Sequence, residues 1–197
     1  PFRITGPAGT ASMMANLEKA FAWDIKTRHE DQRLPLENVA VDATDMADGV
    51  VYAEAGITVS AIKVNHGEKI DPAYGFRVSY GALSVVFSGD TKYSESLARA
   101  AAGADLIVHS VAAISPQLLE KSKVMRAILS HHSEPEDTAK LFGIVKPKLA
   151  VYSHIVTYDQ TDDDIMRRAR AKYAGDVRMG RDMMAMDVGR DGVKVLN

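Results

Sequence analysis

Three residues of the types that bind metals stand where apolar segments of the sequence stop. His66 comes shortly after one such segment, Asp90 follows another through a Ser-Gly pair, and His154 directly follows a third. The ends of strands and the loops after them are where a rigid scaffold positions reactive groups. A carboxylate combined with imidazoles suits zinc or a related divalent ion, so this coincidence indicates a metal site.

Each of these residues also has an ordinary interpretation. A single histidine after a strand is most often a surface residue or a hydrogen-bonded structural one, and Ser88-Gly89-Asp90 is a common turn or helix-cap sequence. The metal hypothesis therefore depends on the three occurring together.

The remaining histidines divide into one functional candidate and several structural ones. His131 and His132 stand just before a predicted helix start, where they could cap the helix with exposed imidazoles, or where His132 could act as a general acid. His109 ends an apolar strand and is either a partner of the site or, as we favour, simply a strand-end residue. His29 lies in a polar stretch and is interpreted as a solvated surface residue.

Composition limits the chemistry that the chain can perform. With no cysteine among 197 residues, thiolate metal sites, disulfides and cysteine nucleophiles are excluded, and a metal must be held by histidine and carboxylate. A net charge of −2 provides no global basic field for nucleic acid. The sequence has neither an apolar run of about 18 residues nor a signal pattern at its start, which favours a soluble protein, cytoplasmic or periplasmic, without a membrane partner.

The elements that must position these residues follow from periodicity. We predict a single domain over residues 1–197 of the α/β (α+β) class. Strands are expected at 2–4, 39–41, 50–54, 57–64, 76–80, 83–87, 105–109 and 149–153, with a final hairpin of 184–188 and 193–196. Helices are expected at 11–25 with Thr10 as its cap, 94–102, 116–128, 135–142 and 162–173, and residues 26–38 are interpreted as a loop or a ragged helix end.

The order of the motifs resembles the ribonuclease Z and arylsulfatase-like branch of the metallo-β-lactamase superfamily. The pairing of Tyr-Gly-Phe-Arg with Ser-Gly-Asp-Thr is the specific part, whereas the Gly-Pro loop alone is only weakly similar to a phosphate-binding loop. The stretches that carry the resemblance are residues 6–10, 64–67 with 72–78, 86–91, 105–109, and 132–136 followed by 152–154.

This resemblance implies an αββα sandwich that holds two metal ions, Zn²⁺ or alternatively Mn²⁺ or Fe²⁺. His66 would complete the first metal's ligands, Asp90 would bridge both ions, and His154 would bind the second. His132 would be the additional histidine that protonates the leaving group, so His132 and Asp90 are the expected catalytic residues. The implied reaction is attack of a metal-activated water on a phosphate, sulfate or carboxylic ester.

The sequence departs from the family's pattern at two places. The opening motif His-x-His-x-Asp-His does not occur among the six histidines, so we expect an N-terminally incomplete sandwich in which each metal keeps one histidine and Asp90. Two protein ligands are fewer than the three usual for catalytic zinc, and we expect this chain to bind zinc weakly or not at all and to be inactive. Ser110 stands where ribonuclease Z-like members carry a glutamate, which weakens that assignment.

Three functions therefore remain in competition. The favoured one is hydrolysis of a small-molecule ester by the full-length protein. Transfer-RNA 3′ processing is less favoured, because no basic substrate-binding extension is found and nucleic acid is a less expected partner. The third is a degenerate binding or scaffold module that forms a homodimer over exposed apolar sheet surface.

Overall fold

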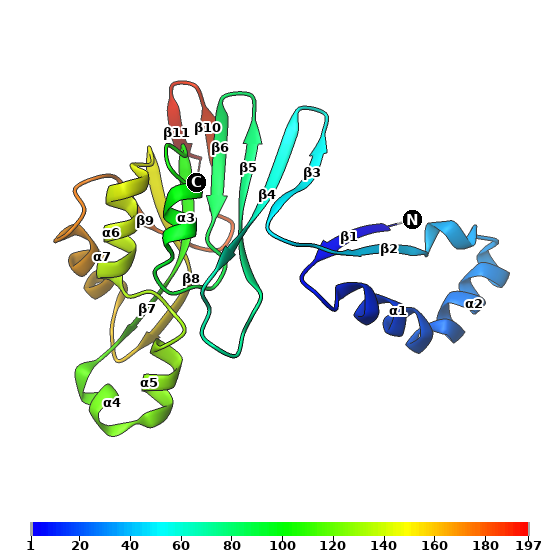
Figure 1. Ribbon diagram of the computed structural model, residues 1–197, viewed down its shortest axis with the longest axis horizontal. Coiled ribbons are helices and arrows are strands. Elements are labelled where there is room, and N and C mark those ends of the chain that lie inside the picture. The colour runs from blue at the N-terminus through cyan, green and yellow to red at the C-terminus, as the bar shows by residue number, and fades with distance from the viewer. Residues whose placement is uncertain (1, 197) are drawn as a thin grey trace. The chain divides into compact units, whose positions relative to one another are not determined.

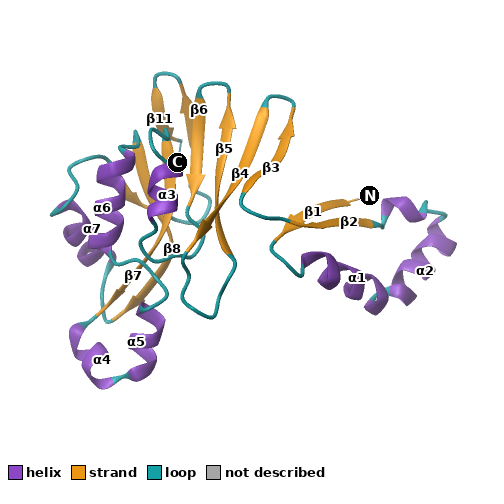
Figure 2. Cartoon of the chain, in the orientation of Figure 1, coloured by secondary structure: helices purple, strands orange, loops and turns teal. Residues whose placement is uncertain are grey.

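The computed structural model describes residues 2–196, and Pro1 and Asn197, the two ends of the predicted domain, lie outside the described residues. The chain divides into two compact units, Pro1–Ala47 and Asp48–Asn197. Figures 1 and 2 show the elements of each. The interpretation of residues 1–197 as one domain stays a prediction.

The N-terminal unit is a pair of parallel strands joined by helices. Its elements are β1 (Phe2–Gly6), α1 (Thr10–Ala20), α2 (Ala22–Gln32), the 3-10 turn η1 (Leu36–Asn38) and β2 (Val41–Asp45). The carboxylate of Asp45 accepts the backbone N–H groups of Gly9 and Ala11 at 3.0 and 2.8 Å, and these bonds hold its pKa below the usual range. Asp45 caps α1 in place of the predicted Thr10, which is already helical.

Of the two alternatives for residues 26–38, the structure has the helix end in the first half, because α2 continues to Gln32. Two ion pairs support this solvated helix, and each joins side chains one helical turn apart. Arg28 binds Asp24 at 2.8 Å, and Lys26 lies 3.8 Å from Glu30. The helix predicted at 11–25 is interrupted at Phe21, and the strand predicted at 39–41 lies later, at β2. Apolar periodicity alone misses a helix that buries no side chain.

The C-terminal unit is built on a seven-stranded mixed sheet in sequential order. Neighbouring strands from β3 to β6 are antiparallel and those from β6 to β9 are parallel. The strands are β3 (Gly49–Glu54), β4 (Ile57–Val64), β5 (Ala73–Tyr80), β6 (Leu83–Phe87), β7 (Leu106–Ile114), β8 (Leu149–Tyr158) and β9 (Val177–Met179). The helices are α3 (Glu95–Ala100), α4 (Pro116–Lys121), α5 (Lys123–Leu129), α6 (Pro135–Val145) and α7 (Asp162–Arg170), followed by the hairpin of β10 (Met186–Gly189) and β11 (Gly192–Val195).

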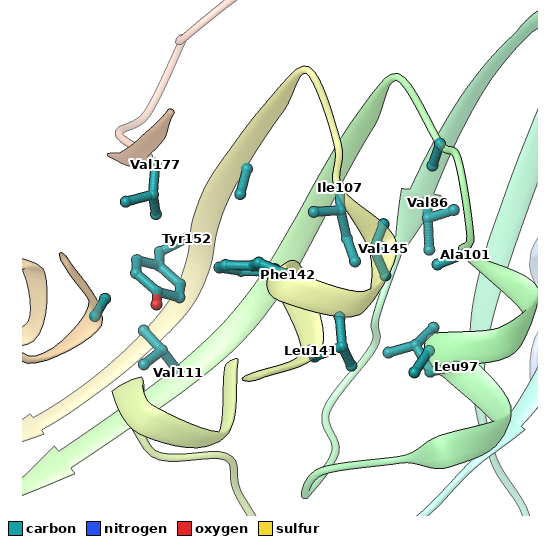
Figure 3. Close-up of a cluster of buried hydrophobic side chains, with 14 of the residues drawn as sticks. Val86, Leu97, Ala101, Ile107, Val111, Leu141, Phe142, Val145, Tyr152 and Val177 are labelled. Atoms are coloured by element: carbon teal, nitrogen blue, oxygen red, sulfur yellow. The ribbon is translucent and has the colours of Figure 1, made fainter. Parts of the chain in front are cut away.

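Both faces of this sheet are covered, at least over its parallel half. On one face α3, α6 and α7 bury a core in which Phe142 packs against Tyr152 and Ile107 (Figure 3). On the other face Leu106 and Leu149 lie under the β10/β11 hairpin. The predicted layered α/β fold is confirmed, and its central sheet is mixed.

Two strands run further than expected, and one predicted helix is divided. The strands predicted to end at His109 and Ser153 continue to Ile114 and Tyr158, so those predicted ends are wrong. The helix predicted at 116–128 breaks at Ser122, whose extended backbone lets its hydroxyl cap α5. Figure 1 shows α4 and α5 as a pair beyond the end of β7. Among the described residues, no helix combines the length and apolarity needed to cross a bilayer.

Phe142 is fully buried and contacts His109, Tyr152 and Tyr173. We expect Phe142→Ala to lower the free energy of unfolding by about 3–5 kcal/mol, because it removes buried area and leaves a cavity. Chemical denaturation measures the change. Ile144→Ala on the same helix, where the side chain is 49% exposed, is the control and should cost about 1 kcal/mol at most. Equal losses in the two variants would contradict this account of the core.

Candidate metal centre

The residues proposed as metal ligands meet at one edge of the sheet. Because β5 runs antiparallel between β4 and β6, and β6, β7 and β8 are parallel, the carboxyl ends of β4, β6, β7 and β8 lie at the same edge. His66 follows β4, Asp90 follows β6, and His132 lies on the segment that returns from β7 to α6. The topology therefore gathers residues that are far apart in sequence.

Asp90 lies at the centre of the group. Its Oδ2 atom is 3.9 Å from Nε2 of His66 and 3.4 Å from Nε2 of His154. The ring of His132 lies edge-on to His66 at a centroid distance of 5.3 Å and stacks on His154 at 5.6 Å. All four residues predicted for the site are thus brought together.

The loop that carries Asp90 requires glycine for steric reasons. Gly89 has a φ of +60°, and a Cβ there would collide with the carbonyl oxygen of Tyr74. A Cβ on Gly75 would lie 2.7 Å from the carbonyl oxygen of Phe87. The two glycines therefore let β5 and the Asp90 loop approach each other closely, which explains why Tyr-Gly and Ser-Gly-Asp occur together.

Two histidines have one ring nitrogen already engaged. Nδ1 of His66 lies 2.9 Å from the carbonyl oxygen of His131, and Nδ1 of His132 lies 2.8 Å from that of Ile128. A carbonyl can only accept, so each Nδ1 carries the proton and donates it. Each Nε2 then keeps a free lone pair, as in metal-binding histidines whose other nitrogen donates to a backbone carbonyl.

Thr91 joins the three loops that carry these residues. Its hydroxyl accepts the N–H of Asn65 at 3.2 Å and lies within hydrogen-bond distance of the Asn65 and Lys92 carbonyls, one of which its single proton can serve. Its carbonyl oxygen accepts the hydroxyl of Ser133 at 2.9 Å. Thr91 is fully buried, so it holds the segments next to His66, Asp90 and His132 in one place.

His154 lies on a bulge inside β8. The sequence predicted it after a strand end, and that prediction is wrong. The pairing with β7 steps from Ser110 opposite Ser153 to Val111 opposite Ile155, which leaves His154 unpaired with β7. Its φ is +45°, an uncommon value for a residue with a side chain. A bulge of this kind re-aims a side chain, and here it accompanies the approach of the imidazole to Asp90.

The alternative role of the histidine pair as helix caps is wrong. Glu134 caps α6 reciprocally with Asp137. Arg168 on α7 binds Glu134 at 2.8 Å and Glu136 at 2.6 Å, and its hydrogen bond lowers the pKa of Glu136. These contacts fix the start of α6 at Pro135, three positions after His132.

The other histidines lie outside the group around Asp90, with one partial exception. His131 packs its ring against His66 at 5.7 Å, a contact that the sequence did not predict. His29 is exposed, as expected, with Nδ1 2.6 Å from the Leu34 carbonyl. His109 is fully buried against Phe142, and its predicted place at a strand end is wrong.

A small cavity of about 200 Å³ adjoins Asp90 and His154 and is lined in part by Ser110. Ser110 is 3% exposed, and its hydroxyl has no hydrogen-bond partner among the described residues. The cavity therefore adjoins Ser110, the residue at which the family resemblance implies a glutamate.

The residues present fit a divalent metal ion. One ligand atom each from His66, Asp90 and His132 lie within 4.8 Å of one another. Two imidazole lone pairs and a carboxylate are a donor set that zinc accepts. His154, at 3.4 Å from Asp90, is a further donor at the same carboxylate. The assignment of His66, Asp90 and His154 as ligands, and of His132 as an acid, stays a prediction.

Two residues that hold the site escaped the sequence analysis. Thr91 belongs to the Ser-Gly-Asp-Thr motif without a predicted role of its own, and no pattern in the sequence points to Arg168. Thr91 follows Asp90 directly, so a hydroxyl next to a predicted ligand was an available signal. Arg168 lies more than thirty positions from its partners, and no short-range pattern marks such a pair.

Comparisons with known proteins agree on one family. A family model described as a beta-lactamase superfamily domain matches residues 2–155. Ribonuclease Z of Mycolicibacterium gilvum (strain PYR-GCK) is 30% identical over 195 residues, covering 95% of this chain and 66% of that protein. Ribonuclease Z of Mycolicibacterium paratuberculosis is 31% identical over 193 residues, covering 95% and 68%. The chain thus spans about two thirds of the length of these relatives.

Solved structures share the fold at low sequence identity. Human tRNase Z, short form, superposes with a TM-score of 0.57 at 16% identity and covers 96% of this chain and 68% of that one. Zn²⁺-bound PqqB from Methylobacterium extorquens gives 0.61 at 13% identity, with 92% and 63% covered. At these identities the likeness concerns the fold alone.

We expect Asp90→Asn to weaken zinc binding by about 100-fold or more, since loss of even an outer partner of a metal ligand commonly costs 10–100-fold. The Asp90 carboxylate lies close to the imidazoles of His66 and His154, and its negative charge favours the binding of a cation there. Because residues 1–197 alone are expected to bind zinc weakly, competition titration of the protein at its full natural length with a zinc indicator measures the affinity. Asp42→Asn, an exposed carboxylate on β2, is the charge-matched control. Unchanged affinity in Asp90→Asn would remove this carboxylate from the site.

Burial lowers the pKa of His109 to about 4. An unfolded chain protonates this histidine near pH 6.5, whereas the folded chain resists protonation until about pH 4. The contribution of His109 to the free energy of unfolding is therefore fully present above about pH 6.5. This free energy falls by about 3 kcal/mol as the pH falls from about 6.5 toward about 4. We expect His109→Leu to flatten this part of the pH dependence in urea denaturation. His29→Gln, at an exposed position, should leave it intact, and a similar flattening there would contradict the assignment.

Proposed function

The chain belongs to the metallo-β-lactamase superfamily, and on this premise we propose that it is the core of a metal-dependent hydrolase of esters. The proposed substrates are phosphate, sulfate or carboxylic esters, and the proposed cofactor is Zn²⁺, with Mn²⁺ or Fe²⁺ as alternatives. The observation that carries the proposal is the convergence of His66, Asp90, His132 and His154 at one sheet edge. The chain covers about two thirds of the length of its relatives, so any activity of the whole protein is proposed here in the same way.

In the proposed mechanism the protein residues bind, orient and transfer a proton. His66, Asp90 and His154 would hold two ions, with Asp90 shared between them. When bound, such ions supply Lewis acidity, which lowers the pKa of the attacking water and polarises the ester oxygen. In its doubly protonated form His132 would donate the proton on Nε2 to the leaving oxygen, because the proton on Nδ1 is committed to the Ile128 carbonyl.

The number of ligands limits what residues 1–197 can do alone. The motif His-x-His-x-Asp-His does not occur in this sequence. With His132 acting as an acid, one histidine and Asp90 remain for each of two ions, fewer than the three protein ligands of ordinary catalytic zinc. We therefore propose that this chain by itself binds zinc weakly and hydrolyses esters slowly or not at all.

A second candidate is endonucleolytic processing of RNA. The curated relatives named ribonuclease Z make RNA a plausible substrate, whereas none of them supports the small-molecule ester expected from the sequence. Ser110 and its small cavity stand against it, because the glutamate implied by the family resemblance is missing there. A homodimer, or a scaffold without catalysis, stays a prediction that these observations do not favour.

The test is metal-dependent hydrolysis by the protein at its full natural length, beside residues 1–197 alone. Bis(p-nitrophenyl) phosphate, p-nitrophenyl acetate and a 3′-extended transfer RNA separate the substrate classes. We expect a chelator or Asp90→Asn to abolish turnover, and His132→Asn to lower kcat by about 10²–10⁴-fold, the usual contribution of a general acid. Asp42→Asn should retain full activity. Turnover that survives both the chelator and Asp90→Asn would reject the proposal.

A further inference from the structure

The turn after α5 contacts two imidazoles of the candidate metal centre. In this turn the N–H of His131 donates to the carbonyl oxygen of Ile128 at 3.2 Å, and the N–H of His132 donates to that of Leu129 at 3.2 Å. Carbonyl groups at the end of a helix lack a partner within the helix and carry a partial negative charge. They are therefore suited to accept the proton of an imidazole ring.

His131 contacts His66 through its backbone and through its side chain. Its carbonyl oxygen lies 2.9 Å from Nδ1 of His66, a residue 65 positions earlier in the chain. Its ring lies edge-on to the His66 ring, with the ring centroids 5.7 Å apart and the ring planes at 76°. One residue therefore contacts both the protonated nitrogen of His66 and the ring itself.

The same ring of His131 packs against the backbone of Gly67. A Cβ on Gly67 would lie 3.1 Å from Cδ2 and 3.3 Å from Nε2 of His131, which is closer than an ordinary van der Waals contact. The φ of Gly67 is +94°, a value that also favours glycine. The lack of a side chain at position 67 thus lets the His131 ring lie next to the segment that carries His66.

His66 is the most sheltered of the three predicted ligands. Its side chain is 14% exposed, against 41% for Asp90 and 52% for His154. A free imidazole in water populates both neutral tautomers, whereas the hydrogen bond to a carbonyl selects the one with its proton on Nδ1. Nε2 of His66 and Oδ2 of Asp90, 3.9 Å apart, are then two acceptors too far apart for a hydrogen bond, and a cation can bind to both.

We propose that His131 is a positioning residue of the metal centre, which fixes the tautomer of His66 without binding the metal. Its carbonyl oxygen keeps the proton on Nδ1, and its ring holds the α5 turn at the distance from Gly67 that this hydrogen bond needs. Among the described residues, the group whose ligand atoms lie within 4.8 Å of one another contains His66, Asp90 and His132 but not His131. The effect on metal binding rests on the proposed function, whereas the tautomer of His66 does not.

The test reads the tautomer by NMR of the protein at its full natural length, with ¹⁵N in its histidine rings. A chelator removes metal, and at about pH 8 an ordinary imidazole is neutral. We expect the signals of His66, assigned with His66→Gln, to show a protonated Nδ1 and an unprotonated Nε2. His131→Ala should give a mixture of both tautomers, because it removes the ring contact. His131→Phe should retain the Nδ1 form, because a flat ring restores that contact.

Zinc affinity separates positioning from direct binding. His131→Ala should weaken zinc binding by about tenfold, the lower end of the usual effect of losing an outer partner of a metal ligand. His131→Phe has no ring nitrogen to offer a metal and should bind zinc within about twofold of the unmodified protein. An equal loss of affinity in the two variants overturns the proposal, as does a His66 tautomer that His131→Ala leaves unchanged, or a proton on Nε2 in the unmodified protein.

A second variant disturbs the contact while leaving His131 in place. Gly67→Ala should displace the His131 ring and mix the His66 tautomers as His131→Ala does. Gly49→Ala is the control, because Gly49 has a φ of +119° but a Cβ there meets no atom of the described residues within 4 Å. Equal effects of the two glycine variants on the His66 tautomer would contradict the proposed contact.

The two readouts distinguish this inference from the proposed function. If the tautomer depends on the His131 ring but the protein neither binds zinc nor hydrolyses an ester, the hydrolase proposal fails and the positioning of His66 stands. If zinc-dependent hydrolysis is present and the tautomer is the same in His131→Ala and Gly67→Ala as in the unmodified protein, the positioning role fails and the hydrolase proposal stands.

Discussion

The buried hydroxyl and carbonyl of Thr91 are the constraint on which the rest of the site depends. Three loops from different parts of the chain would otherwise meet at the sheet edge with unsatisfied backbone groups, which are costly when water is excluded. Thr91 supplies hydrogen bonds to Asn65 and Ser133 from a fully buried position. As a result, the loops of His66, Asp90 and His132 share one network, and displacing any of them breaks bonds in the others.

The same site depends on a second layer of support farther from Asp90. Arg168 connects α7 with the first residues of α6, and the hydroxyl of Tyr152 pairs with Thr138 at 2.6 Å within the core. Burial raises the pKa of Tyr152 to about 12, so this hydroxyl keeps its proton and its hydrogen bond across the ordinary pH range. The position of His132 therefore reflects packing between two helices and a strand, and not only its own loop.

The parts of the fold that follow short-range rules were predictable from the sequence. Strands β4 and β6 match their predicted bounds, because alternation and flanking glycines mark them on both sides. The ends of β7 and β8 were not predictable: once parallel neighbours are buried together, pairing continues through polar residues such as Ser110 and Ser153. Of the candidate site, His66, Asp90 and His154 were predicted as ligands from their positions after apolar segments, and the structure brings the three together. The connections made by Thr91 and Arg168 required the tertiary structure.

The bulge at His154 has a consequence for how this site could change over evolutionary time. A backbone with φ of +45° favours glycine, and a histidine there carries strain that nothing in the pairing with β7 relieves. Substitution by glycine or asparagine would ease the backbone and remove the imidazole in one step. Selection for robustness alone therefore pulls this position away from histidine, and its retention in a lineage would be a signature of selection for what the imidazole does.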